Sequence, residues 1–275
     1  MNGKTVGSGP KETSMDIRIL KDKPAMGRAA GEYAADIVHR ALHEQGQARI
    51  IVATGASQFE VLDTLAAAPD LYWPRVTVFH LDEYAGMPAA HPASFRKYLW
   101  ERFHRRLTLP VRAFHYLNAE DDAAAECRRV GDLLREGPID VACVGIGENG
   151  HLAFNDPPAD FETDQPYLQV TLDEACRRQQ HGEGWFKTLN DVPTHAISMS
   201  IRQIMASRAV VCSVPEKRKA EAVRNALEGP VTNRVPASIL QQHAACVFFL
   251  DQAAASMMKG RTSDTKANGK CGKDR

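Results

Sequence analysis

Residues 49–81 read RIIVATGASQFEVLDTLAAAPDLYWPRVTVFHL and contain the pattern from which the fold class follows. The apolar, β-branched run at 49–54 predicts a strand, the amphipathic stretch at 57–67 predicts a helix, and the run at 76–81 predicts a second strand. A strand, a helix and a strand in this order are typical of a right-handed crossover between parallel strands.

The same alternation continues on both sides of this stretch. We expect further helices at 28–45, 92–106, 120–136, 216–228 and from 251, and further strands at 139–145, 167–172, 194–199, 208–214 and 245–250. The sequence therefore predicts a single-domain, Rossmann-like α/β fold over residues 16–258, with a mostly parallel sheet and helices on both faces. The polar segments 1–15 and 259–275 are predicted to be disordered tails.

Composition excludes several classes of partner. Among 275 residues, Lys plus Arg and Asp plus Glu both number 34, so no net charge favours nucleic acid or an acidic membrane surface. The six cysteines are far apart and form no CxxC pair, which predicts reduced thiols and no metal centre. We find no signal peptide and no apolar run of the ~20 residues that a membrane span requires, and we expect a cytoplasmic protein.

A turn of small residues follows the strand at 49–54. In open α/β sheets ligands lie beyond the carboxyl ends of the strands. Thr54, Gly55, Ala56 and Ser57 lead from such an end into a helix, where backbone N–H groups and the helix dipole suit a phosphate. An ordinary capping box formed by Ser57 and Glu60, without any ligand, explains the pattern equally well.

Two adjacent carboxylates, Asp82 and Glu83, follow the strand at 76–81. Neighbouring residues of an extended chain point to opposite faces, so one carboxylate can face a cleft while the other packs or caps elsewhere. A carboxylate in a partly dry cleft has a raised pKa and can act as a general base. The alternative for such a pair is a solvated acidic turn.

A glycine-rich loop with a histidine follows the strand at 139–145. Residues 145–150 read GIGENG, which formally matches the dinucleotide fingerprint, but that fingerprint must open a helix, and Pro157 and Pro158 come too soon for one. We interpret the glycines as allowing a close backbone approach to a small ligand. His151 is placed for acid–base chemistry, with Asn149 and Asp156 near enough in sequence to orient it, although a lone histidine can also be purely structural.

Taken in order, these segments resemble the glucosamine-6-phosphate deaminase family. The matching stretches are Ala53–Ser57, Leu81–Pro88 with His91–Ser94, and Gly145–Pro157, and the likeness extends over roughly residues 25–250. The second and third stretches are long and specific.

The resemblance implies deamination of glucosamine 6-phosphate to fructose 6-phosphate and ammonia, an aldose–ketose isomerisation in amino-sugar catabolism, with no metal or organic cofactor. Asp82 would move a proton between C2 and C1 of the open-chain sugar, and His151 would assist ring opening with Asn149 and Asp156. Residues expected to bind the substrate or its phosphate are Thr54, Gly55, Ala56, Ser57, Glu83, Gly147, Arg177 and Lys219. The partner is a small sugar phosphate, and a homo-oligomer is possible.

The chain departs from the family pattern at several positions. The phosphate turn ends Ala-Ser-Gln, Asp156 stands where Glu is common, and Asn149 stands where Asp is common. After Pro157 the serine and basic residues of allosterically regulated members are missing, so we predict no activation by N-acetylglucosamine 6-phosphate. Residues 159–190 are either a lid over the sugar or a surface excursion.

Two alternatives to a deaminase stay open at the level of sequence. One is a 6-phosphogluconolactonase-type hydrolase on the same fold. The other is a sugar-phosphate-sensing module that has lost turnover, although Asp82 and His151 argue against it.

Overall fold

The computed structural model describes residues 15–259, so the predicted tails lie almost wholly outside the described residues, and the domain limits stay a prediction. Within this range a seven-stranded sheet has the order β1-β10-β9-β6-β2-β3-β5, and every neighbouring pair in it is parallel. Its strands are β1 Asp16–Leu20, β2 Ala48–Val52, β3 Val76–His80, β5 Ala113–His115, β6 Val141–Val144, β9 Val210–Val214 and β10 Cys246–Asp251. The expected parallel α/β sheet is confirmed.

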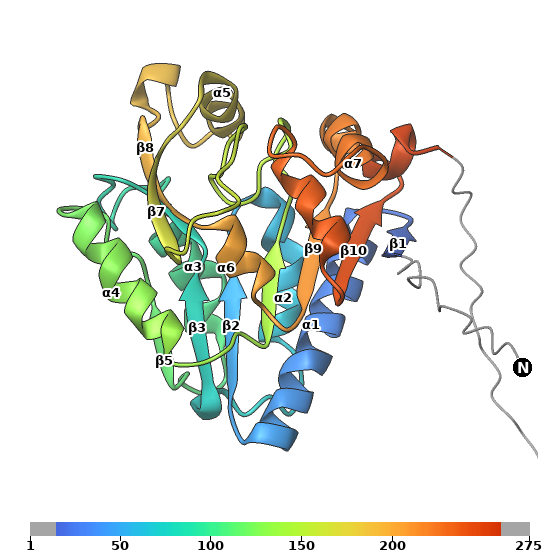
Figure 1. Ribbon diagram of the computed structural model, residues 1–275. Coiled ribbons are helices and arrows are strands. Elements are labelled where there is room, and N and C mark those ends of the chain that lie inside the picture. The colour runs from blue at the N-terminus through green and yellow to red at the C-terminus, as the bar shows by residue number, and fades with distance from the viewer. Residues whose placement is uncertain (1–14, 260–275) are drawn as a thin grey trace, which may run out of the picture.

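Alternating side chains of these strands enter two separate cores. In β2, Ile50 and Val52 pack into the core formed with α1 (Lys23–Gln45), α2 (Phe59–Ala66) and α3 (Phe95–Arg102). Ile51, which points the other way, packs into the core with α4 (Ala123–Arg135), α6 (Ile201–Met205) and α7 (Ala220–Glu228). Helices therefore cover both faces, and Figure 1 shows α1 and α4 on opposite sides of the sheet.

A second, three-stranded antiparallel sheet adjoins the carboxyl end of the first. It has the order β4-β8-β7, formed by Asp82–Tyr84, His195–Met199 and Tyr167–Thr171. With α5 (Glu174–Gly182) it lies above the ends of the central strands in Figure 1. The predicted strands at 167–172 and 194–199 exist, but they belong to this sheet and not to the parallel one.

Other differences from the expected elements have local causes. The three-residue strands β4 and β5 carry too few residues for a periodic pattern, β1 lies at the edge of the predicted domain and was not predicted as a strand, and α5 and α6 are short helices in polar or mixed sequence. Between 252 and 259, where the described residues end, the expected helix is not seen, and the segment forms a single 3₁₀ turn at Ala254–Met257. No helix in the range 15–259 is both long and apolar enough to cross a membrane.

Candidate active site

A cleft opens where β2, β3, β6 and β9 end. It is lined by Ala53, Thr54, Gly55, Ser57, Leu81, Asp82, Phe95, Gly145, Ile146, Gly147, His151, Ala153, Phe154, Gln179, Gln180, Glu183, Pro215, Glu216, Arg218 and Lys219. These positions come from four strand ends and from α5, so the three strand ends singled out in the sequence meet at one site. The placement follows the rule for open parallel sheets.

Asp82 is the buried carboxylate of this cleft. Only 6% of the residue is exposed, and its Oδ1 atom has no hydrogen-bond partner among the described residues. Burial, with the negative charges of Glu83 and Glu183, raises the pKa of Asp82 to about 8. A carboxylate with this pKa and a free oxygen is suited to take and return a proton near neutral pH.

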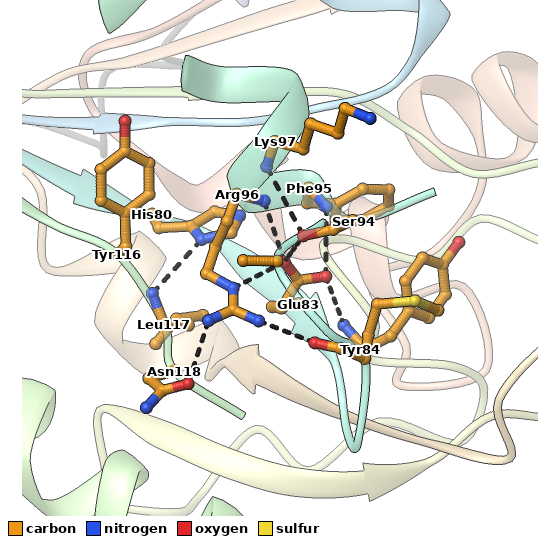
Figure 2. A network of polar contacts seen from close by, with 12 residues as sticks. His80, Glu83, Tyr84, Ser94, Phe95, Arg96, Lys97, Tyr116, Leu117 and Asn118 are labelled. Atoms are coloured by element: carbon orange, nitrogen blue, oxygen red, sulfur yellow. Dashed lines mark hydrogen bonds and ion pairs between the residues drawn. The ribbon is translucent and has the colours of Figure 1, made fainter. Parts of the chain in front are cut away.

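Glu83 is buried and does not line the cleft, so its expected role in binding substrate stays a prediction. Its carboxylate accepts hydrogen bonds from the backbone N–H groups of Tyr84, Phe95 and Arg96, and from Ser94 Oγ. Figure 2 shows these contacts at the start of α3. The second carboxylate is therefore a buried helix cap, as the opposite directions of adjacent residues allow.

In the loop after β6, the imidazole of His151 packs closely against Gly147. A Cβ atom on Gly147 would lie 2.2 Å from His151 Nε2, so any other residue there would occupy the place of the ring. The backbone closes this turn, since Gly147 N–H donates to His151 O at 2.9 Å. His151 itself is buried and lines the cleft.

Asn149 and Asp156 lie behind the histidine. His151 Nδ1 is 3.1 Å from Asp156 Oδ1, within the distance of an ion pair. Asn149 Nδ2 donates to the same Asp156 oxygen at 3.0 Å, and Asn149 Oδ1 accepts from the His151 N–H. Burial opposes ionisation of Asp156, yet contacts with His151 and Asn149 outweigh it and lower the pKa of Asp156. Neither residue lines the cleft. Because Asn149 contacts the backbone N–H of His151 and Asp156 lies beside its Nδ1 atom, both are positioned to orient His151.

The turn before α2 is open to the cleft and is not a capping box. No side chain caps η1 (Ala56–Gln58) or α2, and Ser57 Oγ instead lies 3.4 Å from Gln58 Nε2. Gly55 has a φ of 93°, a backbone angle that favours glycine. Thr54, Gly55 and Ser57 line the cleft, whereas Ala56 does not.

Lys219 is a lysine of the cleft whose ammonium group forms no ion pair with the described residues. Its neighbour Arg218 is paired with Glu216 and with Glu148, both at 2.7 Å, whereas Lys219 is buried and has no ion pair among the described residues. Burial, with the nearby charge of Arg218, lowers the pKa of Lys219 to about 8. An unpaired ammonium beside an open turn is a candidate anion site.

Arg177 does not join the other predicted residues. Its guanidinium donates to the carbonyls of Leu189 and Val192 at 2.8 to 3.2 Å, and it does not line the cleft. Arg177 therefore secures the chain after α5, and its expected contact with a phosphate is not supported by this position.

Several cleft residues were not predicted from the sequence, and those with polar or charged side chains are Gln179, Gln180 and Glu183, at or just after the end of α5, and Glu216 and Arg218, beside Lys219. Part of the 159–190 segment therefore lines the cleft. A polar helix next to Gly182 and Gly184 gave no signal for which side chains face inward. His151, Asp156 and Cys176 have ligand atoms within 4.8 Å of one another, but Asp156 is already bonded to Asn149 and to the Asp173 N–H.

The fold and the cleft define a class of protein: α/β proteins with a buried carboxylate, a buried histidine and an open turn at the carboxyl edge of a parallel sheet. A family model described as glucosamine-6-phosphate isomerases/6-phosphogluconolactonase matches residues 21–249. The chain belongs to this family.

Individual relatives agree with this assignment. A glucosamine-6-phosphate deaminase of Lactobacillus delbrueckii subsp. bulgaricus is 33% identical over 246 residues, covering 89% of this chain and all of that protein. Glucosamine-6-phosphate deaminase 1 of Bacillus subtilis is 34% identical, covering 82% and 94%. The solved structure of a monomeric glucosamine-6-phosphate deaminase matches with a TM-score of 0.79 at 32% identity, covering 88% of this chain and all of the other. A 6-phosphogluconolactonase from Thermotoga maritima, at 18% identity and a TM-score of 0.72, shares the fold alone.

Proposed function

We propose that this protein is a glucosamine-6-phosphate deaminase, which converts glucosamine 6-phosphate to fructose 6-phosphate and ammonia. The observation that carries the proposal is Asp82, a buried carboxylate with a free oxygen and a pKa raised to about 8, in the same cleft as His151. The relatives at 33 to 34% identity bear this activity in their names.

In this proposal each group of residues has a separate role in the reaction. Lys219 and the turn at 54–57 hold the phosphate, which places C2 of the sugar against Asp82. His151, oriented by Asp156 and Asn149, moves the proton needed to open the sugar ring. Asp82 then takes the C2 proton of the open-chain aldose and returns it to C1, and water displaces ammonia from the resulting imine at C2.

A lactonase is the nearest competing activity, because distant relatives with this fold carry that name. The test is to supply glucosamine 6-phosphate and 6-phosphogluconolactone to the same enzyme preparation. We expect ammonia from the first and no acceleration of hydrolysis of the second. Rapid lactone hydrolysis without ammonia release would contradict the proposal.

The proposed setting is the cytoplasm, with a small sugar phosphate as the ligand. The five cysteines within the described residues are all free and buried, which suits a reducing compartment. The possible homo-oligomer stays a prediction, and the related deaminase described as monomeric favours a single chain. Sedimentation of the purified protein distinguishes the two states.

A further inference from the structure

Glu183 is a third carboxylate of the cleft, and the reaction described above does not use it. It is the C-cap residue that directly follows α5, and it lines the cleft together with Asp82 and Lys219. Unlike Glu216 and Glu148 at the rim, which are both paired with Arg218, Glu183 has no ion pair within the described part of the chain. The cleft thus contains one unpaired ammonium and one unpaired carboxylate at its anion-binding end.

The carboxylate of Glu183 lies next to the turn that is expected to hold the phosphate. Its Oε2 atom lies 3.9 Å from where a Cβ atom on Gly55 would stand, so the carboxylate faces the turn. Burial raises the pKa of Glu183, while the positive charges of Lys219 and then Arg218 oppose that shift more than any other groups do. A negative charge here would repel a phosphate that approached Gly55 and Lys219.

The chain around Glu183 has room to change direction. Gly182 and Gly184 flank it, and an added Cβ atom on either would meet nothing within 4 Å. Gly184 has a φ of 85°, so the chain turns sharply just after the carboxylate. The backbone on either side of Glu183 is therefore not held by packed side chains at these two glycine positions.

We propose that Glu183 is the counter-ion of the anion site: its carboxylate faces Gly55 in the cleft that Lys219 also lines, and a phosphate must displace it to bind. This inference rests on the proposed function for its natural ligand, a sugar phosphate. It makes Glu183 a residue that sets the affinity of the phosphate end of the cleft.

Calorimetric titration with inorganic phosphate tests the proposal without any turnover. Removing the negative charge by Glu183→Gln is expected to tighten phosphate binding about tenfold, the order of effect of one nearby like charge. The matched control is Glu174→Gln on the same helix, since Glu174 is an exposed residue paired only with Arg178, and it should bind phosphate as the wild type does. Unchanged or weaker binding in a folded Glu183→Gln variant would overturn the proposal.

A second titration separates this role from binding of the substrate's amino group. With Asp82→Asn as background to prevent turnover, Glu183→Gln should tighten glucosamine 6-phosphate and fructose 6-phosphate alike. Weaker binding of glucosamine 6-phosphate alone would assign Glu183 to the ammonium and overturn the counter-ion role. If the wild type releases no ammonia while Glu183→Gln still binds phosphate more tightly, the proposed function fails and the counter-ion role stands.

Discussion

At the scale of single residues, Asp82 and Glu83 are two adjacent acids with opposite environments. Glu83 has four hydrogen-bond donors around its carboxylate, whereas Asp82 keeps one oxygen unpartnered. The sequence predicted that the two would face apart, but it placed both in the site. Only the contacts at the start of α3 show that Glu83 caps that helix.

The Glu83→Ala variant should therefore be less stable than the wild type. It leaves buried N–H groups and the Ser94 hydroxyl without an acceptor, which costs about 3 kcal/mol of unfolding free energy. Chemical denaturation measures the loss, and Asp82→Asn is the control, because it removes a buried charge without removing a cap. Equal stability of Glu83→Ala and the wild type would contradict the assigned role.

The pH dependence of kcat/KM follows from two shifted groups. Asp82 must be ionised to act as a base, so with a pKa raised to about 8 the rate should climb as pH rises toward 8. Lys219 must be charged to hold phosphate, so with a pKa lowered to about 8 the rate should fall above it. A bell-shaped profile centred near pH 8 is expected, and Lys219→Arg should move its alkaline limb upward. A flat profile from pH 6 to 9 would be incompatible with these assignments.

Gly147 determines where the imidazole can lie. Gly147→Ala should displace His151 and lower kcat about 10²-fold, because the new methyl group would overlap the ring. Gly131→Ala on α4 is the matched control, since its added atom meets neighbours at ordinary distances of 3.5 Å or more. Steady-state kinetics of the two variants measure kcat. Full activity in Gly147→Ala would show that the imidazole of His151 does not need glycine at position 147.

At the scale of elements, α1 approaches α2 closely and so supports the turn that begins α2. A Cβ atom on Gly31 would lie 2.6 Å from Thr64 Cβ and 2.8 Å from Val61 O. Gly31→Val should push the helices apart, lower stability by about 1 to 3 kcal/mol and weaken phosphate binding. Thermal melts and phosphate titration measure both effects, with exposed Glu32→Ala as control. Unaltered melting would show that the close crossing is dispensable.

The elements also show where sequence patterns stop being informative. Long periodic runs such as those in α1, α4 and β2 were found, because apolar spacing alone specifies them. The three-residue strands β4 and β5 were not, because pairing with distant partners defines them. For the same reason Arg177 was placed at the phosphate: the sequence shows a cation but not the carbonyls of Leu189 and Val192 that it binds.

At the scale of the whole molecule, the parallel sheet brings separate strand ends into one cleft, with α5 above them (Figure 1). This convergence was predictable, since the rule for open α/β sheets requires only that the strands be parallel. The contribution of α5 was not, because its sequence is mostly polar and its position depends on the second sheet. Asp82, His151 and Lys219 were found in sequence, while Glu183 required the structure.

The most direct test of the central claim is to measure ammonia and fructose 6-phosphate together as glucosamine 6-phosphate is consumed, in the wild type and in Asp82→Asn. We expect both products in equal amounts from the wild type, and a loss of about 10²- to 10⁴-fold in rate in the variant, the range for removal of a general base. Asp82→Asn that still binds phosphate would show that the loss is chemical. Absence of both products from the folded wild type, or full activity of Asp82→Asn, would contradict the account.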